Sequence, residues 1–217
     1  NAHERPQAIA RDVARGIVLP NMMQDLFSRI ETILPGHQGF FRPHFGSHFG
    51  LAMFIKNELE IIEEGEAWVF KDQNATHTNN VSNHARNIQY ATLQTIHGPR
   101  TVINFHGLWN GKGKTNSEDR LVQSDNLVSF IQKTQHPLVL AGDFNLLPET
   151  ERLKKFERLG LRNLIAEFGV SSTRTRLYSK PLKFADYVFV STDITVHEFK
   201  VLPDVVSDHT ALYLDFA

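Results

Sequence analysis

The spacing of apolar residues predicts helices in the first forty residues of the chain. Apolar side chains recur there every three to four positions, as they do on one face of a helix. This spacing is found at Ile9, Val13 and Ile17, and again at Leu26, Phe27, Ile30, Ile33 and Leu34. Two helices are therefore expected before the first strand.

After this part the period changes to two, which is typical of strands. Strands are expected at residues 49–55, 59–62, 88–96, 101–106, 137–141, 187–191, 195–201 and 211–216. Helical spacing returns within residues 117–133 and 149–159, and a short helix is expected up to Gly169. Thr115 and Glu118 match a capping box at the start of the first of these helices. Because helices and strands alternate without a regular βαβ period, the pattern favours two packed sheets with helices outside them.

The composition fits a single domain of 217 residues, since two-sheet folds commonly reach that size undivided. The chain has no cysteine, which excludes a disulfide scaffold and a thiolate zinc site and favours a reducing compartment. It also has no run of about 18 apolar residues, so no membrane span is expected. We expect a cytoplasmic, monomeric protein.

The net charge of the chain does not indicate binding to long nucleic acid. Lys and Arg number 23 against 24 Asp and Glu, so the formal net charge is -1. Binding through many phosphates usually requires a basic excess. A local basic face remains open, because cations gather in loop-like segments at Lys112, Lys114, Arg120, Arg174, Arg176, Lys180 and Lys183. Nucleic acid is thus a partner that the net charge does not indicate.

Polar residues that suit phosphate chemistry stand at three predicted strand ends. Gly142-Asp143-Phe144-Asn145 follows the apolar run 137–141, Asp186 opens the strand-like segment 186–191, and Ser207-Asp208-His209 precedes the last strand. Together they supply three carboxylates, an amide and an imidazole. This set can hold a hard cation beside a phosphate and move a proton nearby. The sequence therefore indicates a metal-dependent phosphoesterase.

Strand alternation predicts which of these side chains share a face. Residues two apart point the same way, so Asp143 and Asn145 are expected to point toward a site while Phe144 turns into the core. The same rule places Asn104 and His106 together. The residues alone leave simpler interpretations open, because Asp and Asn commonly build a turn after a strand. A strand-end histidine such as His106 can also be a core residue bonded to backbone.

In these motifs the chain resembles the endonuclease/exonuclease/phosphatase superfamily, which includes exonuclease III, pancreatic-type deoxyribonucleases, inositol-polyphosphate phosphatases and neutral sphingomyelinases. The resemblance spans residues 45–217 in the family's order, and its four motifs are Asn104-Phe105-His106, Gly142-Asp143-Phe144-Asn145, Asp186 to Ser191 and Ser207-Asp208-His209. It implies an α+β fold, a four-layered α/β sandwich in which two mixed β-sheets lie face to face with helices outside.

The resemblance also implies roles for the acidic residues and the last histidine. Asp208 is expected to ligate the divalent metal, which would be Mg²⁺ or alternatively Mn²⁺. His209 is expected to work at the scissile phosphate, with Asp186 orienting its ring. Asp143 is expected to position or deprotonate the attacking water, or to assist the leaving oxygen.

Three further residues are expected to contact the substrate. By resemblance, Asn145 would hydrogen-bond the phosphoryl group and His106 would be a second histidine at the phosphate. Asn104, on the same strand face as His106, joins them as a candidate substrate-binding residue.

The chain departs from the family pattern at its beginning. Family members start with a strand that carries an Asn, then a helix, then a strand that ends in Gln-Glu, whose Glu is a principal metal ligand. Neither the strand with the Asn nor the strand that ends in Gln-Glu is found here. Residues 1–217 are therefore expected to form one domain that lacks its N-terminal strand and this Glu. We expect roughly 30 to 45 further residues before Asn1 in the natural protein. The missing start is expected to leave either a gap in a sheet beside the strand that holds Asp143 or a metal near Asp208 with an incomplete shell of protein ligands.

The expected activity is therefore metal-dependent hydrolysis of a phosphodiester or phosphomonoester by water. A nuclease acting on DNA or RNA is the alternative enzyme. A catalytically impaired binding module with the same fold is the alternative from a different class, because the Glu is not found.

Overall fold

The computed structural model describes residues 25–47, 49–72, 84–109, 113–115 and 117–217. The first predicted helix, with Ile9, Val13 and Ile17, lies outside the described residues. The second is observed as α2 (Leu26–Ile33). Among the described helices, none combines the length and the apolar character that crossing a membrane requires.

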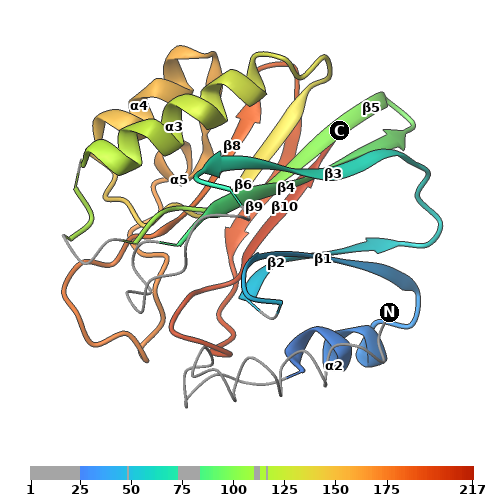
Figure 1. The fold of residues 1–217 in the computed structure, drawn as a ribbon, viewed down its shortest axis with the longest axis horizontal. Coiled ribbons are helices and arrows are strands. Elements are labelled where there is room, and N and C mark those ends of the chain that lie inside the picture. The colour runs from blue at the N-terminus through green and yellow to red at the C-terminus, as the bar shows by residue number, and fades with distance from the viewer. Residues whose placement is uncertain (1–24, 48, 73–83, 110–112, 116) are drawn as a thin grey trace.

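A six-stranded mixed sheet forms the centre of the molecule (Figure 1). Its strands, in spatial order, are β3 (Ile61–Phe70), β4 (Arg86–Thr95), β5 (Gly98–His106), β6 (Leu138–Asp143), β8 (Asp186–Ser191) and β7 (Leu161–Asn163). The pair β5–β6 is parallel and the other pairs are antiparallel. The predicted apolar run before Asp143 therefore lies in the interior of the sheet.

Three helices cover one face of this sheet: α3 (Glu118–Ile131), α4 (Glu151–Arg158) and α5 (Leu164–Glu167) (Figure 1). Their apolar side chains form one buried cluster with the sheet, in which Leu127 and Phe156 of the helices join Leu140 and Phe189 of the strands. Full burial of such a side chain stabilises the fold by about 1.5–3 kcal/mol. The helices therefore stabilise the central strands by burying one face of the sheet.

Two antiparallel pairs form the other strands of the described structure, β1 (His37–Phe45) with β2 (Phe49–Lys56) and β9 (Val196–Val201) with β10 (Leu212–Phe216). The first pair packs on β4 and β5, and α2 packs on β1. The second pair adds Phe199 and Leu214 to the apolar cluster. The predicted α+β class, a four-layered sandwich of sheets with helices outside, is confirmed.

Side-chain amides of the six-stranded sheet bind the β1–β2 pair through its backbone. Gln89 donates to the Phe40 carbonyl at 3.0 Å, and Asn104 donates to the Ala52 carbonyl at 3.1 Å. These side-chain bonds add to the apolar contacts between the layers and fix the β1–β2 pair over β4 and β5.

Several local predictions were wrong. Residues 37–45 form a strand although their apolar residues do not alternate, because β1 contacts both α2 and β4 and so has no single solvent face. Strand β3 continues to Phe70, well beyond residue 62, and residues 161–163 form β7 where a helix was expected. The N-cap of α3 is Ser117, without a side-chain capping bond, so Thr115 and Glu118 form no capping box.

The expected gap in the sheet beside the strand of Asp143 is absent, since β6 pairs with both β5 and β8.

Two glycines let the strand ends that carry the polar motifs come very close together. A Cβ on Gly142 would lie 1.9 Å from the Phe105 carbonyl oxygen, and Gly142 has a φ of 145°. A Cβ on Gly107 would lie 2.1 Å from the Phe144 carbonyl oxygen. Glycine is the one residue that fits such contacts and such a φ without strain. The sequence Gly142-Asp143 thus depends on its glycine to bring β6 against β5.

Candidate active site

Three neighbouring strands each place one polar residue at the same edge of the six-stranded sheet. The register pairs His106 of β5 with Asp143 of β6, and Asp143 with Asp186 of β8. Residues directly opposite one another on adjacent strands project to the same face. Motifs eighty residues apart in the sequence therefore form one row.

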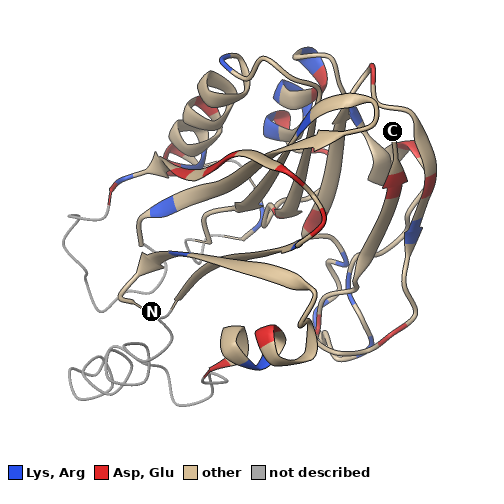
Figure 2. Ribbon diagram, turned by 90° about the vertical axis from the view of Figure 1, so that its right-hand side faces the viewer, with Lys and Arg blue, Asp and Glu red and all other residues tan. Residues whose placement is uncertain are grey.

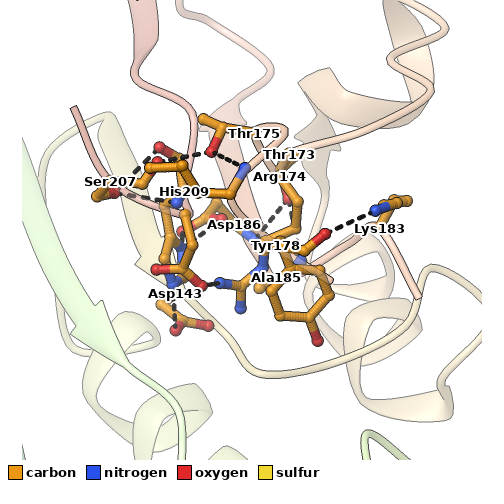
Figure 3. A network of polar contacts seen from close by, with 12 residues as sticks. Asp143, Thr173, Arg174, Thr175, Tyr178, Lys183, Ala185, Asp186, Ser207 and His209 are labelled. Carbon is orange, nitrogen blue, oxygen red and sulfur yellow. Dashed lines mark hydrogen bonds and ion pairs between the residues drawn. The ribbon is translucent and has the colours of Figure 1, made fainter. Parts of the chain in front are cut away.

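His209 enters this row from the loop before β10. An isolated bridge joins His209 to Arg174, and the Thr175 N–H donates to the Asp208 carbonyl at 3.0 Å. The His209 Nδ1 atom lies 2.8 and 2.9 Å from the two carboxylate oxygens of Asp186 (Figure 3). Its Nε2 atom lies 3.7 Å from Oδ2 of Asp143. The imidazole is thus held between two carboxylates, with one nitrogen toward each.

The titration of these groups follows from their contacts. Burial lowers the pKa of His209, but the hydrogen bond to Asp186 and the charges of Asp186 and Asp143 outweigh it, so the pKa is raised. Burial and the neighbouring Asp186 raise the pKa of Asp143 to about 6, although the His209 charge opposes them. The carboxylate bond makes Nδ1 of His209 a donor, which leaves Nε2 as the nitrogen that can exchange a proton with a substrate.

Asn145 occupies a turn and does not continue the strand. Strand β6 ends at Asp143, and Asn145 has a left-handed φ of 53°. Its N–H donates to Oδ1 of Asp143 at 2.8 Å, and its side-chain amide donates to the Gly107 carbonyl at 3.1 Å. The simpler interpretation, a turn after the strand, is therefore correct in part. Phe144 lies in the core as predicted, with its ring centroid 4.9 Å from that of Phe105.

The two other predicted substrate-binding residues differ in position. His106 belongs to the row of polar residues, beside Asp143. Asn104 lies two residues earlier on β5, and its amide donates to the Ala52 carbonyl of the other layer. The shared face of these two residues therefore does not bring both to the site, and Asn104 joins the sheets together.

Asp208, the predicted metal ligand, is bound to a cation of the protein. Its Oδ2 atom lies 2.7 Å from Nη1 of Arg174. The Arg174 side chain is 5% exposed and that of Asp208 is 47% exposed. Arg174 therefore holds Asp208 at the rim of the site, apart from the closest group of carboxylates.

Two more cations face the row, and the motif analysis gave neither a role in catalysis. Arg86 opens β4, is buried, and interacts with the charge of Asp143; burial lowers the pKa of Arg86 to about 10. Lys114 donates to the Phe184 carbonyl, and burial with the nearby Arg174 lowers the pKa of Lys114 to about 8. The buried arginine has no periodic signal in the sequence, whereas Lys114 was recognised as one of several loop cations.

The donor set of the row suits a hard cation. One ligand atom each from Asp143, Asp186 and His209 lie within 4.8 Å of one another. Carboxylate oxygens are the ligands that Mg²⁺ and Mn²⁺ prefer. Two carboxylates this close repel each other, as the raised pKa of Asp143 indicates, and an adjacent cation would relieve that repulsion.

A buried histidine, His44, lies next to His106. The ring centroids of His44 and His106 are 5.8 Å apart. Nδ1 of His44 donates to Oδ1 of Asn87 at 3.2 Å, since the Asn87 amide nitrogen itself donates to Glu66. Burial, with Arg86 nearby, lowers the pKa of His44 to about 2, and burial lowers that of His106 to about 3. Both rings are therefore neutral in the folded protein.

The buried His44 should make the fold sensitive to acid. Its folded pKa of about 2 is below the unfolded value of 6.5, so below pH 6.5 the unfolded chain takes up a proton that the folded chain refuses. Stability should fall as the pH falls from 6.5, by about 2 kcal/mol for this group at pH 5. Urea unfolding of His44→Gln across this range should show a shallower loss. The exposed His97→Gln is the control and should keep the parent slope; an unchanged slope in His44→Gln would contradict the assignment.

Comparison with known proteins agrees with this geometry. The sequence matches the model of the Endonuclease/Exonuclease/phosphatase family over residues 11–209. No curated protein sequence matches the chain.

Similar solved structures include a mannosyl-6-phosphatase from Bacteroides thetaiotaomicron VPI-5482, with a TM-score of 0.71 and 17% identity over 88% of this chain and 80% of that one. The catalytic domain of human Nocturnin with bound sulfate gives a TM-score of 0.62 and 21% identity, covering 89% and 76% of the two chains. D. rerio TDP2 in complex with a single-stranded DNA product gives 0.66 and 14%, covering 99% and 92%. At these identities the likeness shows the fold.

Proposed function

The chain belongs to the Endonuclease/Exonuclease/phosphatase family, and we propose that it is a divalent-metal-dependent hydrolase of phosphate esters. The observation that carries the proposal is the position of His209. Its Nδ1 atom is bound to Asp186 at 2.8 Å, while its Nε2 atom lies 3.7 Å from Asp143. An imidazole that one carboxylate orients and that lies near a second carboxylate can donate a proton while the second carboxylate accepts one.

We assign the proton donor to His209. The bond from Nδ1 to Asp186 fixes the tautomer and the orientation of the ring, and it favours the protonated form. The imidazolium can stabilise charge on a phosphoryl oxygen as it develops, and its Nε2–H can pass to the leaving oxygen as the bond from phosphorus to that oxygen breaks. Asp186 acts through His209 as a positioning residue.

We assign the positioning of the attacking water to Asp143. Its Oδ1 atom accepts the Asn145 N–H, while Oδ2 faces His209. Oδ2 can accept a proton from the water as the water oxygen bonds to phosphorus. One proton thus moves from the water to Asp143 while His209 supplies another to the leaving group, so the two residues divide the base and acid roles.

Phosphate binding is assigned to the groups around this pair. Asn145 and the neutral His106 can contact phosphoryl oxygens, and Arg86 and Lys114 supply positive charge beside Asp143. Asn104 is left out of this set because its amide binds the other layer of strands, at the Ala52 carbonyl, whereas Asn145 is bound to Asp143 itself. Positive charge aimed at a phosphate stabilises the charge that builds up in the transition state.

The metal is proposed from the donor set. Asp143 and Asp186 provide closely spaced carboxylates, and Asp208 would join them on exchanging Arg174 for a cation. A bound Mg²⁺ would supply Lewis-acid polarisation of the phosphoryl oxygen. Every proton transfer proposed above is made by side chains of the protein itself.

Turnover of chromogenic esters tests the proposal. With Mg²⁺ present, the protein should hydrolyse bis-p-nitrophenyl phosphate or p-nitrophenyl phosphate, and His209→Ala prepared in parallel should not. A single-stranded oligonucleotide in the same assay would reveal the nuclease alternative, as cleavage products that His209→Ala does not form. If parent and His209→Ala release product at the same low rate from all three substrates, the chain is a binding module and the proposed activity is wrong.

A further inference from the structure

Two loops form one rim beside the candidate active site. We call residues 171–185 and 202–210 the rim loops. Thr175 Oγ1 donates to the Ser207 carbonyl at 2.6 Å, and the Thr210 N–H donates to the Thr173 carbonyl at 3.2 Å. Figure 1 shows the two loops side by side, the first in orange and the second in red. Because Asp208 and His209 belong to the second loop, the rim lies directly beside the candidate active site.

Aliphatic side chains on both rim loops are exposed. The Tyr178 N–H donates to the Thr175 carbonyl at 3.1 Å, which closes a turn with Arg176 and Leu177 at its tip. Leu177 is 56% exposed and Leu182 46%. On the other loop Val206, next to Ser207, is 81% exposed. Leaving such groups in water is unfavourable, and an apolar patch at a rim is typical of an interaction surface.

Positive charge accompanies these aliphatic groups. Residues 174–183 carry Arg174, Arg176, Lys180 and Lys183 and no acidic residue. The acidic residues of the rim loops are Asp204 and Asp208, and Asp208 is bound to Arg174. Arg176 and Lys180 are exposed. In the rest of the molecule, Lys and Arg are interspersed with Asp and Glu along the ribbon (Figure 2). The rim therefore has a local positive excess on a chain of net charge -1.

We propose that the rim loops dock on an anionic lipid surface. Exposed aliphatic groups insert among lipid chains at the interface, while adjacent Lys and Arg attract anionic head groups. Single-stranded nucleic acid instead uses aromatic platforms and an extended basic groove. The aromatic rings of the rim loops, Tyr178 and Phe184, are half-buried, and the Arg174 guanidinium covers the Tyr178 ring at 4.4 Å. The exposed residues Leu177, Leu182 and Val206 are aliphatic and do not stack on bases, so the lipid surface is the partner that fits. This surface goes beyond the proposed hydrolysis and does not depend on it.

Docking in this way would bring the site to the head groups of the membrane. The rim loops carry both the exposed aliphatic residues and the groups of the site, His209 and the Arg174–Asp208 pair. Because His209 is bound to Asp186, contact through the rim loops would bring the row of His106, Asp143 and Asp186 near the membrane surface. A phosphorylated head group is therefore within the chemistry that the site offers.

Vesicle sedimentation tests the docking surface directly, without turnover. The protein should sediment with vesicles that contain about one-third phosphatidylserine in phosphatidylcholine and much less with phosphatidylcholine alone, and salt should weaken the binding. Arg176→Glu with Lys180→Glu should reduce the partition coefficient by about 10-fold or more. Leu177→Asp with Val206→Asp should reduce it by a similar factor, because the insertion is lost.

Matched controls lie away from the rim. Ile96→Asp changes an aliphatic residue that is 94% exposed in the β4–β5 turn, and Lys154→Glu reverses an exposed charge on α4. Both should bind vesicles like the parent. Hydrolysis of a soluble ester by the rim variants should match the parent, which separates a failure of docking from a failure of the active site. Equal sedimentation of parent and rim variants, or binding of a single-stranded oligonucleotide with none to vesicles, would overturn the proposal.

Discussion

Replacing His209 with alanine should lower kcat for a phosphate ester by on the order of 10²- to 10⁴-fold, the usual value of a positioned acid or base. The physical reason is its position between Asp186 and Asp143, with Nδ1 bound at 2.8 Å and Nε2 3.7 Å from Oδ2. Asp186→Asn should cost a large part of the same factor, because an amide neither fixes the tautomer nor favours the charged ring. Steady-state kinetics at saturating substrate measure both losses.

The two residues should act as one unit. If Asp186 works only through His209, the double variant should be hardly slower than His209→Ala alone. The exposed His197→Ala serves as the control and should keep the parent kcat. Thermal unfolding should show that the variants remain folded. Losses that simply multiply in the double variant would mean that Asp186 and His209 act separately.

Removal of divalent cations should abolish turnover almost completely. A chelator followed by gel filtration should lower the rate by at least about 100-fold, since a cation at a phosphate contributes several kcal/mol to the transition state. Mg²⁺ or Mn²⁺ added back should restore it, whereas full activity after exhaustive chelation would contradict the proposal.

Binding of the cation can be followed apart from activity. Electron paramagnetic resonance with Mn²⁺ should show weaker binding for Asp143→Asn, whose carboxylate belongs to the closest group of ligand atoms. Asp208→Asn should also weaken it if Asp208 leaves Arg174 for the cation. Asp215→Asn, on β10 and exposed, is the matched control and should bind like the parent. If Asp143→Asn and Asp208→Asn both bind like the control, the donor set is wrongly chosen.

Local patterns in the sequence were sufficient for the elements that are packed on one side or fully buried. The apolar run before Asp143 became β6, because a short buried strand needs apolar residues on both faces. The alternation in Asp143-Phe144 also held, and Phe144 contacts four aromatic rings of the core. Strand β1 carries no alternating pattern in its sequence, because it contacts both α2 and β4.

The candidate site also depends partly on local sequence and partly on tertiary structure. The residue types of Asp143, Asp186 and His209 indicated their chemistry, because few other arrangements combine two carboxylates with an imidazole at strand ends. Their meeting within 4.8 Å depends on strand register, which only the assembled sheet fixes.

The sequence by itself determined the fold class and the polar residue types at the ends of the central strands, since periodicity and residue type are local properties of the chain. The tertiary structure decided which side chains and backbone groups contact one another. Asp208 lies on Arg174, 34 residues away in the chain, and Asn104 binds the Ala52 carbonyl, 52 residues away. Arg86 is buried next to the charge of Asp143. Hydrogen bonds and ion pairs over such separations form only when distant segments pack together, and no local pattern encodes which donor meets which acceptor.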